Sequence, residues 1–197
     1  IYFMVDCVQG LSQVDQSIGR WIKDNHKPCV LVVNKWDLAI GVEISEYRNY
    51  IHSRLPFLTH VPIAMISVLK GTGLDALYEL TQEVRRQMAQ PTPTPLLNRC
   101  LQEAQQRQLP KAERGKIPKL MYATRINGDA PTFLIFGKGL TGLQEAYKRY
   151  LEAYLRKKLN LSYAPLKFIY KNKVVSESAS HRREQKGLSG PRPSVRL

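Results

Sequence analysis

The chain has 197 residues, of which 43% are hydrophobic and 23% are charged, and its formal net charge is +14 at pH 7. This composition is typical of a soluble globular protein of one or two domains. No apolar run is long enough to span a bilayer and no signal peptide is recognisable, so the sequence predicts a protein without a membrane span.

The positive charge is confined to one half of the chain. Residues 1–90 contain nine Lys/Arg and nine Asp/Glu, whereas residues 91–197 contain twenty-one Lys/Arg and seven Asp/Glu. This asymmetry predicts two modules, of which the second faces phosphates; the alternative is a solvated basic surface. The three cysteines, Cys7, Cys29 and Cys100, are odd in number and lack metal-type spacing, which favours buried, reduced thiols and predicts a cytoplasmic location.

Strand and helix patterns alternate through residues 1–90. Apolar runs predict buried strands at 1–5, 29–33 and 63–66, and helical spacing of apolar residues predicts helices at 13–25, 43–55 and 74–88. Ser12 is the expected N-cap of the first helix, whose apolar positions are Val14, Ile18, Trp21 and Ile22. Alternating strands and helices imply right-handed crossovers and a parallel sheet. We therefore expect an α/β fold that is half of a doubly wound domain, with its first strands absent.

The strand at residues 29–33 ends abruptly in Asn34-Lys35-Trp36-Asp37. Asn-Lys-x-Asp is the guanine-reading signature of GTP-binding domains, and ligands of open α/β sheets bind just beyond the carboxyl ends of strands. The Asp37 carboxylate would accept hydrogen bonds from the ring N–H and the amino group of guanine. Adenine lacks this pair of donors and would leave the carboxylate unpaired, at a cost of about 1–3 kcal/mol. A polar turn at the strand end is the alternative interpretation.

Other residues are expected to complete this guanine site. Lys35 would lay its methylene stem along the purine, and Asn34 would tie its loop to the neighbouring segments. Ser67, Val68 and Leu69 follow the next strand at the same sheet edge, where backbone N–H groups could donate to the guanine carbonyl and Ser67 would hold the turn. Ser67 taken alone also fits an ordinary strand-end residue.

The phosphate-binding part of a GTP site is missing from the sequence. A Gly-x-x-x-x-Gly-Lys-Ser/Thr loop is absent, and Lys70-Gly71-Thr72-Gly73 has the right residue types in the wrong order. No residue of this chain is therefore predicted to be catalytic or to bind a metal. We expect the chain to be the C-terminal part of a longer protein.

The alternating prolines of residues 91–95 predict an extended linker between two domains. Residues 96–171 follow with helix, strand, strand, helix and strand patterns, an α-β-β-α-β order that predicts a small α+β module. Residues 172–197 are poor in apolar side chains and rich in Ser, Gly, Pro, Lys and Arg, which predicts a disordered basic tail.

The second module also offers candidates for RNA contact. They are basic residues of its second helix, at 143–159: Lys148, Arg149, Arg156, Lys157 and Lys158. They could form a phosphate-facing stripe, although they do not share one helical face, and a solvated helix surface is the alternative. Gly139-Leu140-Thr141-Gly142 has the letters of the KH-domain loop that clamps a nucleic-acid backbone, but it follows a strand, which favours a helix-entry turn.

The chain resembles the Der (EngA) family of bacterial GTPases, which have two tandem GTP-binding domains and a C-terminal KH-like domain. The first module is similar in Asn34-Lys35-Trp36-Asp37, Arg54-Leu55-Pro56-Phe57-Leu58, Pro62-Ile63 and Ile66-Ser67. The second is similar in Leu96-Leu97-Asn98-Arg99, Tyr122-Ala123-Thr124, Pro131-Thr132-Phe133 and Tyr147-Lys148-Arg149-Tyr150-Leu151-Glu152. The segments at residues 54–58 and 147–152 are not general GTPase motifs and make the resemblance specific, and it extends over about residues 1–171.

The resemblance implies that residues 1–90 are the back half of the second GTP-binding domain and that residues 96–171 are the KH-like domain. It implies that the ligand is GTP or GDP and that Mg²⁺ binds only in the intact protein. It also implies that the intact protein hydrolyses GTP during assembly of the large ribosomal subunit and that its partner is this subunit or its rRNA. Two other readings remain open. One is a non-enzymatic RNA-binding module with a vestigial nucleotide-binding half, and the other is an Era-like GTPase, which would have a helix–Gly-x-x-Gly–helix segment.

Overall fold

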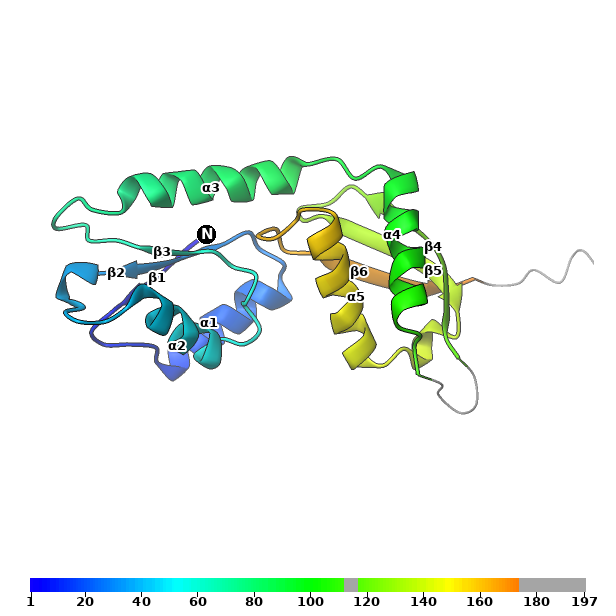
Figure 1. Cartoon of the computed structure of the whole chain (residues 1–197), viewed down its shortest axis with the longest axis horizontal. Coiled ribbons are helices and arrows are strands. Elements are labelled where there is room, and N and C mark those ends of the chain that lie inside the picture. The colour runs from blue at the N-terminus through cyan, green and yellow to red at the C-terminus, as the bar shows by residue number, and fades with distance from the viewer. Residues whose placement is uncertain (112–116, 174–197) are drawn as a thin grey trace, which may run out of the picture.

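The computed structural model describes residues 1–111 and 117–173, and these form two modules that lie side by side (Figure 1). Within that part of the chain, no helix combines the length and the apolar character required to cross a membrane. The predicted basic tail at residues 172–197 falls almost entirely outside the described residues.

The first module is a three-stranded parallel sheet with helices on both faces. The strand order is β1-β2-β3, so β2 is central and β1 lies at an edge. The predicted α/β fold is confirmed. Its elements are β1 (Tyr2–Asp6), α1 (Gln13–Asp24), β2 (Val30–Asn34), η1 (Trp36–Leu38), α2 (Ile44–Arg54), β3 (Ile63–Met65) and α3 (Leu74–Ala89).

The alternation of side chains along β2 explains why this sheet is covered on both sides. Leu31 and Val33 pack in the core beneath α1 and α2, whereas Val30 and Val32 pack in the core beneath α3. Successive side chains of a strand point to opposite faces, so a strand that is covered on both faces has an uninterrupted apolar sequence. Figure 1 shows α3 along one face of the sheet and α1 and α2 along the other.

The helix α1 has the predicted N-cap, Ser12, but most of its apolar side chains are exposed and not buried as predicted. Ser12 Oγ accepts a hydrogen bond from Asp15 N at 3.2 Å, and Asp15 Oδ2 accepts one from Ser12 N at 2.8 Å, which completes a capping box. Of the four apolar positions assigned to this helix, only Ile22 is buried. Val14 and Trp21 are 67% and 55% exposed, and Ile18 is exposed as well, because a sheet of three strands covers only part of the helix.

The second module has the predicted α-β-β-α-β order and a mixed sheet. The strand β5 is central, antiparallel to β4 and parallel to β6. Buried residues of both helices, including Leu97, Leu101 and Leu151, pack on Phe133 and Ile135 of β5 to form its core. Its elements are α4 (Thr94–Arg107), β4 (Lys119–Ile126), β5 (Thr132–Lys138), η2 (Leu140–Gly142), α5 (Glu145–Lys158) and β6 (Lys167–Asn172).

Two local features of this module bear on the sequence analysis. The helix α4 begins at Thr94, inside the expected linker. Pro95 is tolerated in its first turn, because a backbone N–H at that position would have no partner within the helix. The Gly139–Gly142 segment lies between β5 and α5 and includes the short helix η2, so it enters a helix instead of joining two.

The C-terminal end of α3 is bonded directly to the second module. Gln87, which is buried, accepts a hydrogen bond through Oε1 from Tyr163 N at 2.7 Å, and Gln90 Nε2 donates to Leu159 O at 2.9 Å. Arg125 of β4 donates to the carbonyl oxygens of Met88 and Gln90. The helix that leaves the first module is thereby fixed against two segments of the second.

Candidate functional site

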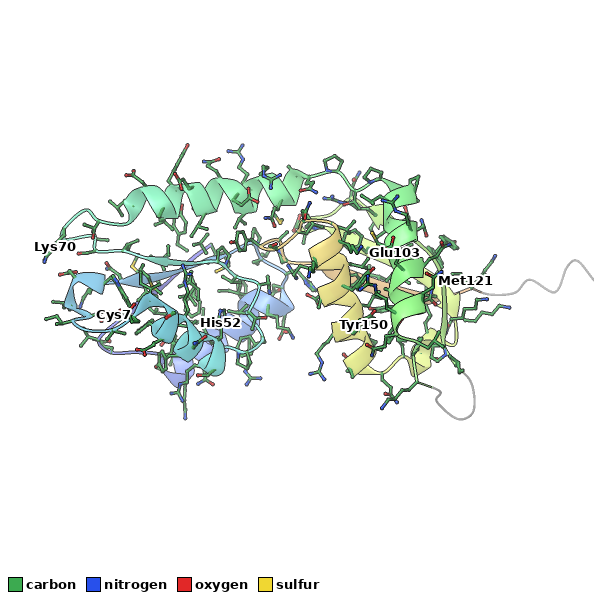
Figure 2. The ribbon with its side chains drawn as sticks, in the orientation of Figure 1. Cys7, His52, Lys70, Glu103, Met121 and Tyr150 are labelled. Carbon is green, nitrogen blue, oxygen red and sulfur yellow. The ribbon has the colours of Figure 1, made fainter. Side chains whose placement is uncertain are left out.

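The carboxyl ends of the three parallel strands bring the predicted guanine-site residues together. Asp6 at the end of β1 is the register partner of Asn34 at the end of β2, and Val33 is paired with Met65 of β3. The loops that follow β2 and β3 therefore meet at one edge of the sheet. Figure 2 shows Lys70, in the second of these loops, at the end of the first module that lies farthest from the second module.

Asn34 joins the two loops. Its Oδ1 accepts a hydrogen bond from Val68 N at 3.2 Å, and its carbonyl oxygen accepts one from Cys7 N at 3.1 Å. Trp36 N donates to Ile66 O at 3.0 Å, which adds a second link between the same two loops. The Asn34 side chain thus binds the backbone of the second loop and holds the two loops together. Because its side chain occupies the Val68 N–H, that group is not available to a base.

Both the backbone and the amino group of Lys35 have defined positions. Its backbone has the left-handed conformation, with φ of 61°, and this turns the chain directly after β2. Its Nζ lies 2.7 Å from Asp6 Oδ2, and the hydrogen bond from Lys35 is the main reason that the pKa of the Asp6 carboxyl is lowered. The amino group is therefore anchored beside β1, and the methylene stem is left to line the pocket.

The pocket at this edge has a volume of about 210 Å³ and is lined by six residues: Asn34, Lys35, Asp37, Leu38, Ser67 and Leu69. Among the described residues, the Asp37 carboxylate has neither a hydrogen-bond nor an ion-pair partner. Over the same residues the backbone N–H of Leu69 is also unpaired, and its side chain is 90% exposed. The pocket thus presents the carboxylate of Asp37 as a free acceptor and the backbone N–H of Leu69 as a free donor.

Ser67 shapes the second loop from inside the protein. Its side chain is buried, its backbone N–H and C=O both pair with Thr72, and its Oγ accepts a hydrogen bond from Lys70 N at 3.2 Å. Gly73 then leads into α3 with φ of 77°, and a Cβ placed there would lie 2.2 Å from Met65 O. The loop therefore has a fixed path in which Leu69 is presented at the tip.

The basic residues of α5 divide between two surfaces. Lys148, Arg149, Arg156 and Lys157 line a cleft of about 1150 Å³ between the two modules. Lys158 lies toward α4, where its Nζ pairs with Glu103 Oε2 at 3.1 Å. Figure 2 shows Glu103, the partner of Lys158, and Tyr150 in the region of α4 and α5.

Arg156 stabilises the local structure through hydrogen bonds to neighbouring segments. Its guanidinium donates to the carbonyl oxygens of Leu161 and Ala164 at 2.9 and 2.6 Å and to Glu152 Oε1 at 2.9 Å. Its side chain is only 14% exposed. Arg156 therefore fixes the chain that connects α5 to β6, whereas the neighbouring Lys157 is exposed.

This difference predicts effects of very different size on stability for two adjacent substitutions. Arg156→Met removes the donor from the part-buried carbonyl oxygens of Leu161 and Ala164 and from the half-exposed Glu152 carboxylate, and is expected to lower the free energy of unfolding by about 1–3 kcal/mol. Lys157→Met is expected to change it by less than about 0.5 kcal/mol, because that side chain is exposed. Urea denaturation followed by circular dichroism measures both. Equal effects would contradict the structural role of Arg156.

Sequence reasoning missed the residues that the first module contributes to the cleft. Lys23 in the last turn of α1, His26 and Lys27 in the loop after it, and His60 line it together with α5. Burial lowers the pKa of His60 to about 3, helped by the charges of Arg156 and Lys23. His60 is therefore uncharged at neutral pH. No sequence signal links these positions, because they lie more than 80 residues from α5 and on a different module.

Comparison with known proteins identifies the family of both modules. Residues 92–171 match a family model described as the KH-domain-like C-terminal domain of EngA bacterial GTPase enzymes. The chain is 34% identical over 173 residues to GTPase Der of Acetivibrio thermocellus, a match that covers 86% of this chain and 39% of that protein.

Two further relatives give the same result. GTPase Der of Sulfurihydrogenibium sp. is 34% identical over 173 residues, covering 88% of this chain and 39% of the relative. GTPase Der of Variovorax paradoxus is 32% identical over 172 residues, covering 87% and 38%. The chain therefore spans about two-fifths of the length of the relatives that it matches, and the resemblance found in the sequence is confirmed. This chain belongs to the Der (EngA) family.

Proposed function

We propose that residues 1–90 supply the guanine-reading loops of a GTP-binding domain and that residues 96–171 form a KH-like domain facing RNA of the large ribosomal subunit. In this proposal the intact protein is a cytoplasmic GTPase of ribosome assembly. The observation that carries the guanine assignment is the unpaired carboxylate of Asp37, in a pocket that also holds the Lys35 stem and the free N–H of Leu69. Asn34 and Ser67 shape this pocket from behind.

The pocket fits a base better than it fits phosphate. Its charged groups are one carboxylate and one lysine that already pairs with Asp6 at 2.7 Å. An anionic phosphate gains nothing from a free carboxylate, whereas the amino edge of guanine offers two donors to it. We therefore assign phosphate contacts, Mg²⁺ and hydrolysis to the intact protein and the base contacts to this chain.

The open edge of β1 supports the view that residues 1–90 are part of a larger sheet. The strand β1 has a partner on one side only among the described residues. Tyr2 and Met4 on this strand are exposed, as are Val14 and Trp21 on the neighbouring helix. Exposed apolar side chains beside an unpaired strand edge are the surface that an additional strand and helix would cover.

The RNA part of the proposal is supported by the charge of the second module and by its match to the KH-like family. Residues 91–197 carry the whole net charge of the chain. The cytoplasmic location is supported by three cysteines that are all unpaired thiols. The position of Gly139–Gly142 between a strand and a helix argues against the Era-like alternative.

A base titration of the chain tests the guanine assignment. Amide signals of the ¹⁵N-labelled protein are followed during addition of GMP, IMP or AMP. GMP is expected to shift the signals of Asp37 and Leu69 at millimolar concentration. IMP lacks the amino group and is expected to bind about tenfold or more weakly, and AMP to leave these signals in place. Equal shifts with AMP would eliminate the GTP-binding role and favour a non-enzymatic RNA-binding module.

A further inference from the structure

A cleft of about 1150 Å³ lies between the two modules. Its walls are the end of α1 with the following loop and the segment at residues 56–60 on one side, and α5 with the segment before β6 on the other. Figure 1 shows α5 as the helix of the second module that faces α1 and α2. The cleft lies at the opposite end of the first module from the guanine pocket.

The charge of this cleft is strongly positive. Six Lys or Arg residues and two Glu residues line it. Both carboxylates are already used, since Glu145 pairs with Lys148 at 2.6 Å and Glu152 with Arg156 at 2.9 Å. Four cations remain, two from each wall: Lys23, Lys27, Arg149 and Lys157.

The remaining cations have little else to bind within the described part of the chain. Lys23 and Lys27 approach Asp24 and Asp129 at only 4.0 and 3.8 Å, with both carboxylates largely exposed. Such exposed, long ion pairs contribute little. Arg149 and Lys157 have no ion-pair partner among residues 1–111 and 117–173. Four cations in a concave site, two of them weakly paired and two without an ion-pair partner among these residues, attract a ligand with several negative charges.

Partly buried aromatic side chains also line the cleft. Phe57 contributes from the first module and Phe168 and Tyr170 from the second. His26 and His60 lie on the first wall, where burial lowers the pKa of each. They are uncharged at neutral pH, so the positive potential comes from Lys and Arg alone. Aromatic rings beside a basic groove are the combination with which proteins bind single-stranded nucleic acid.

We propose that a single strand of RNA lies in this cleft, with its phosphates between Lys23 and Lys27 on one wall and Arg149 and Lys157 on the other. The inference rests on the proposed RNA-facing function and adds its location. The GTP-binding module itself supplies half of the RNA site. An acidic peptide would use the same cations and would make no use of the aromatic rings.

The test compares two double variants with a matched control in the 197-residue chain. Lys23→Ala/Lys27→Ala removes two cations of the first wall, and Arg149→Ala/Lys157→Ala removes two of the second. Arg48→Ala/Arg85→Ala removes the same charge from exposed positions of the first module outside the cleft. Binding of a fluorescein-labelled twelve-nucleotide poly(U) RNA is measured by anisotropy at several KCl concentrations. Thermal unfolding confirms that each variant is folded.

Each cleft variant is expected to weaken binding about tenfold and to reduce the slope of log Kd against log salt by about 1.4, since each phosphate contact contributes about 0.7. The control is expected to change Kd by less than about twofold. If both cleft variants bind like the control, the location in the cleft is overturned while RNA binding stands. If the parent chain itself does not bind the RNA, the RNA-facing function fails together with this inference. Displacement of the RNA by polyglutamate of equal charge as effectively as by unlabelled RNA would overturn RNA as the occupant.

Discussion

Asp37→Ala is expected to erase the preference of this chain for GMP over IMP. The carboxylate lines the predicted guanine pocket and has no hydrogen-bond or ion-pair partner among the described residues, so it is free to accept both donors of the amino edge. Each charge-assisted hydrogen bond is worth about 1.5–3 kcal/mol, so the loss of both corresponds to a weakening of at least about 100-fold for GMP. The measurement is the ¹⁵N titration with both nucleotides.

The control for this substitution is Glu46→Ala, which removes an exposed carboxylate of α2 from the same module. It is expected to keep the preference. Asp37→Asn provides a second readout, because an amide offers one donor and one acceptor. These match the carbonyl oxygen and ring N–H of xanthine, so XMP is expected to bind this variant better than GMP does. An Asp37→Ala chain that still discriminates GMP from IMP would rule out Asp37 as the base-reading group.

Gly73→Ala is expected to be among the most destabilising single-methyl additions in the first module. The backbone there has φ of 77°, which costs an alanine about 1–2 kcal/mol. The new Cβ would also lie 2.2 Å from Met65 O and 3.1 Å from Ile66 Cα, so β3 or α3 has to move, at a further cost of about 1–3 kcal/mol. Urea denaturation measures the sum, and the guanine pocket is expected to be distorted as well because the Ser67–Thr72 loop shares this anchor.

Gly71→Ala separates the two contributions. This residue lies two positions away with φ of 65°, and no atom lies within 4 Å of the position that its Cβ would take. Only the backbone cost applies, so the expected loss is about 1–2 kcal/mol. Equal losses for the two variants would show that the contact with Met65 does not constrain the loop.

The sequence was most informative where a local pattern and a structural requirement coincide. The apolar run at residues 29–33 predicted a strand buried on both faces, and a strand of that kind places Asn34 at the sheet edge where ligands bind. The α-β-β-α-β order of the second module was likewise predicted and confirmed, since each element has its own period and its own turn residues.

The parts that could not be predicted depend on contacts between distant segments. The helical spacing of Val14, Ile18 and Trp21 was correct for a helix, but their exposure depends on how far the sheet extends beside them. The five basic residues of α5 look alike in sequence. Only packing distinguishes Arg156, which binds carbonyl oxygens, from Lys157, which faces the cleft.

The attachment of α3 at both ends has a mechanical consequence. Its sixteen residues make a rod about 24 Å long. Its N-terminal end follows Gly73, next to the Ser67–Thr72 loop of the predicted guanine pocket. Its C-terminal end is bonded through Gln87 and Gln90 to Tyr163 and Leu159. Because a helix is stiff along its axis and both ends of α3 are held, a shift of its N-terminal end would be transmitted to Tyr163 and Leu159. Those two residues belong to the KH-like module, so α3 connects the loop at residues 67–73 mechanically to that module.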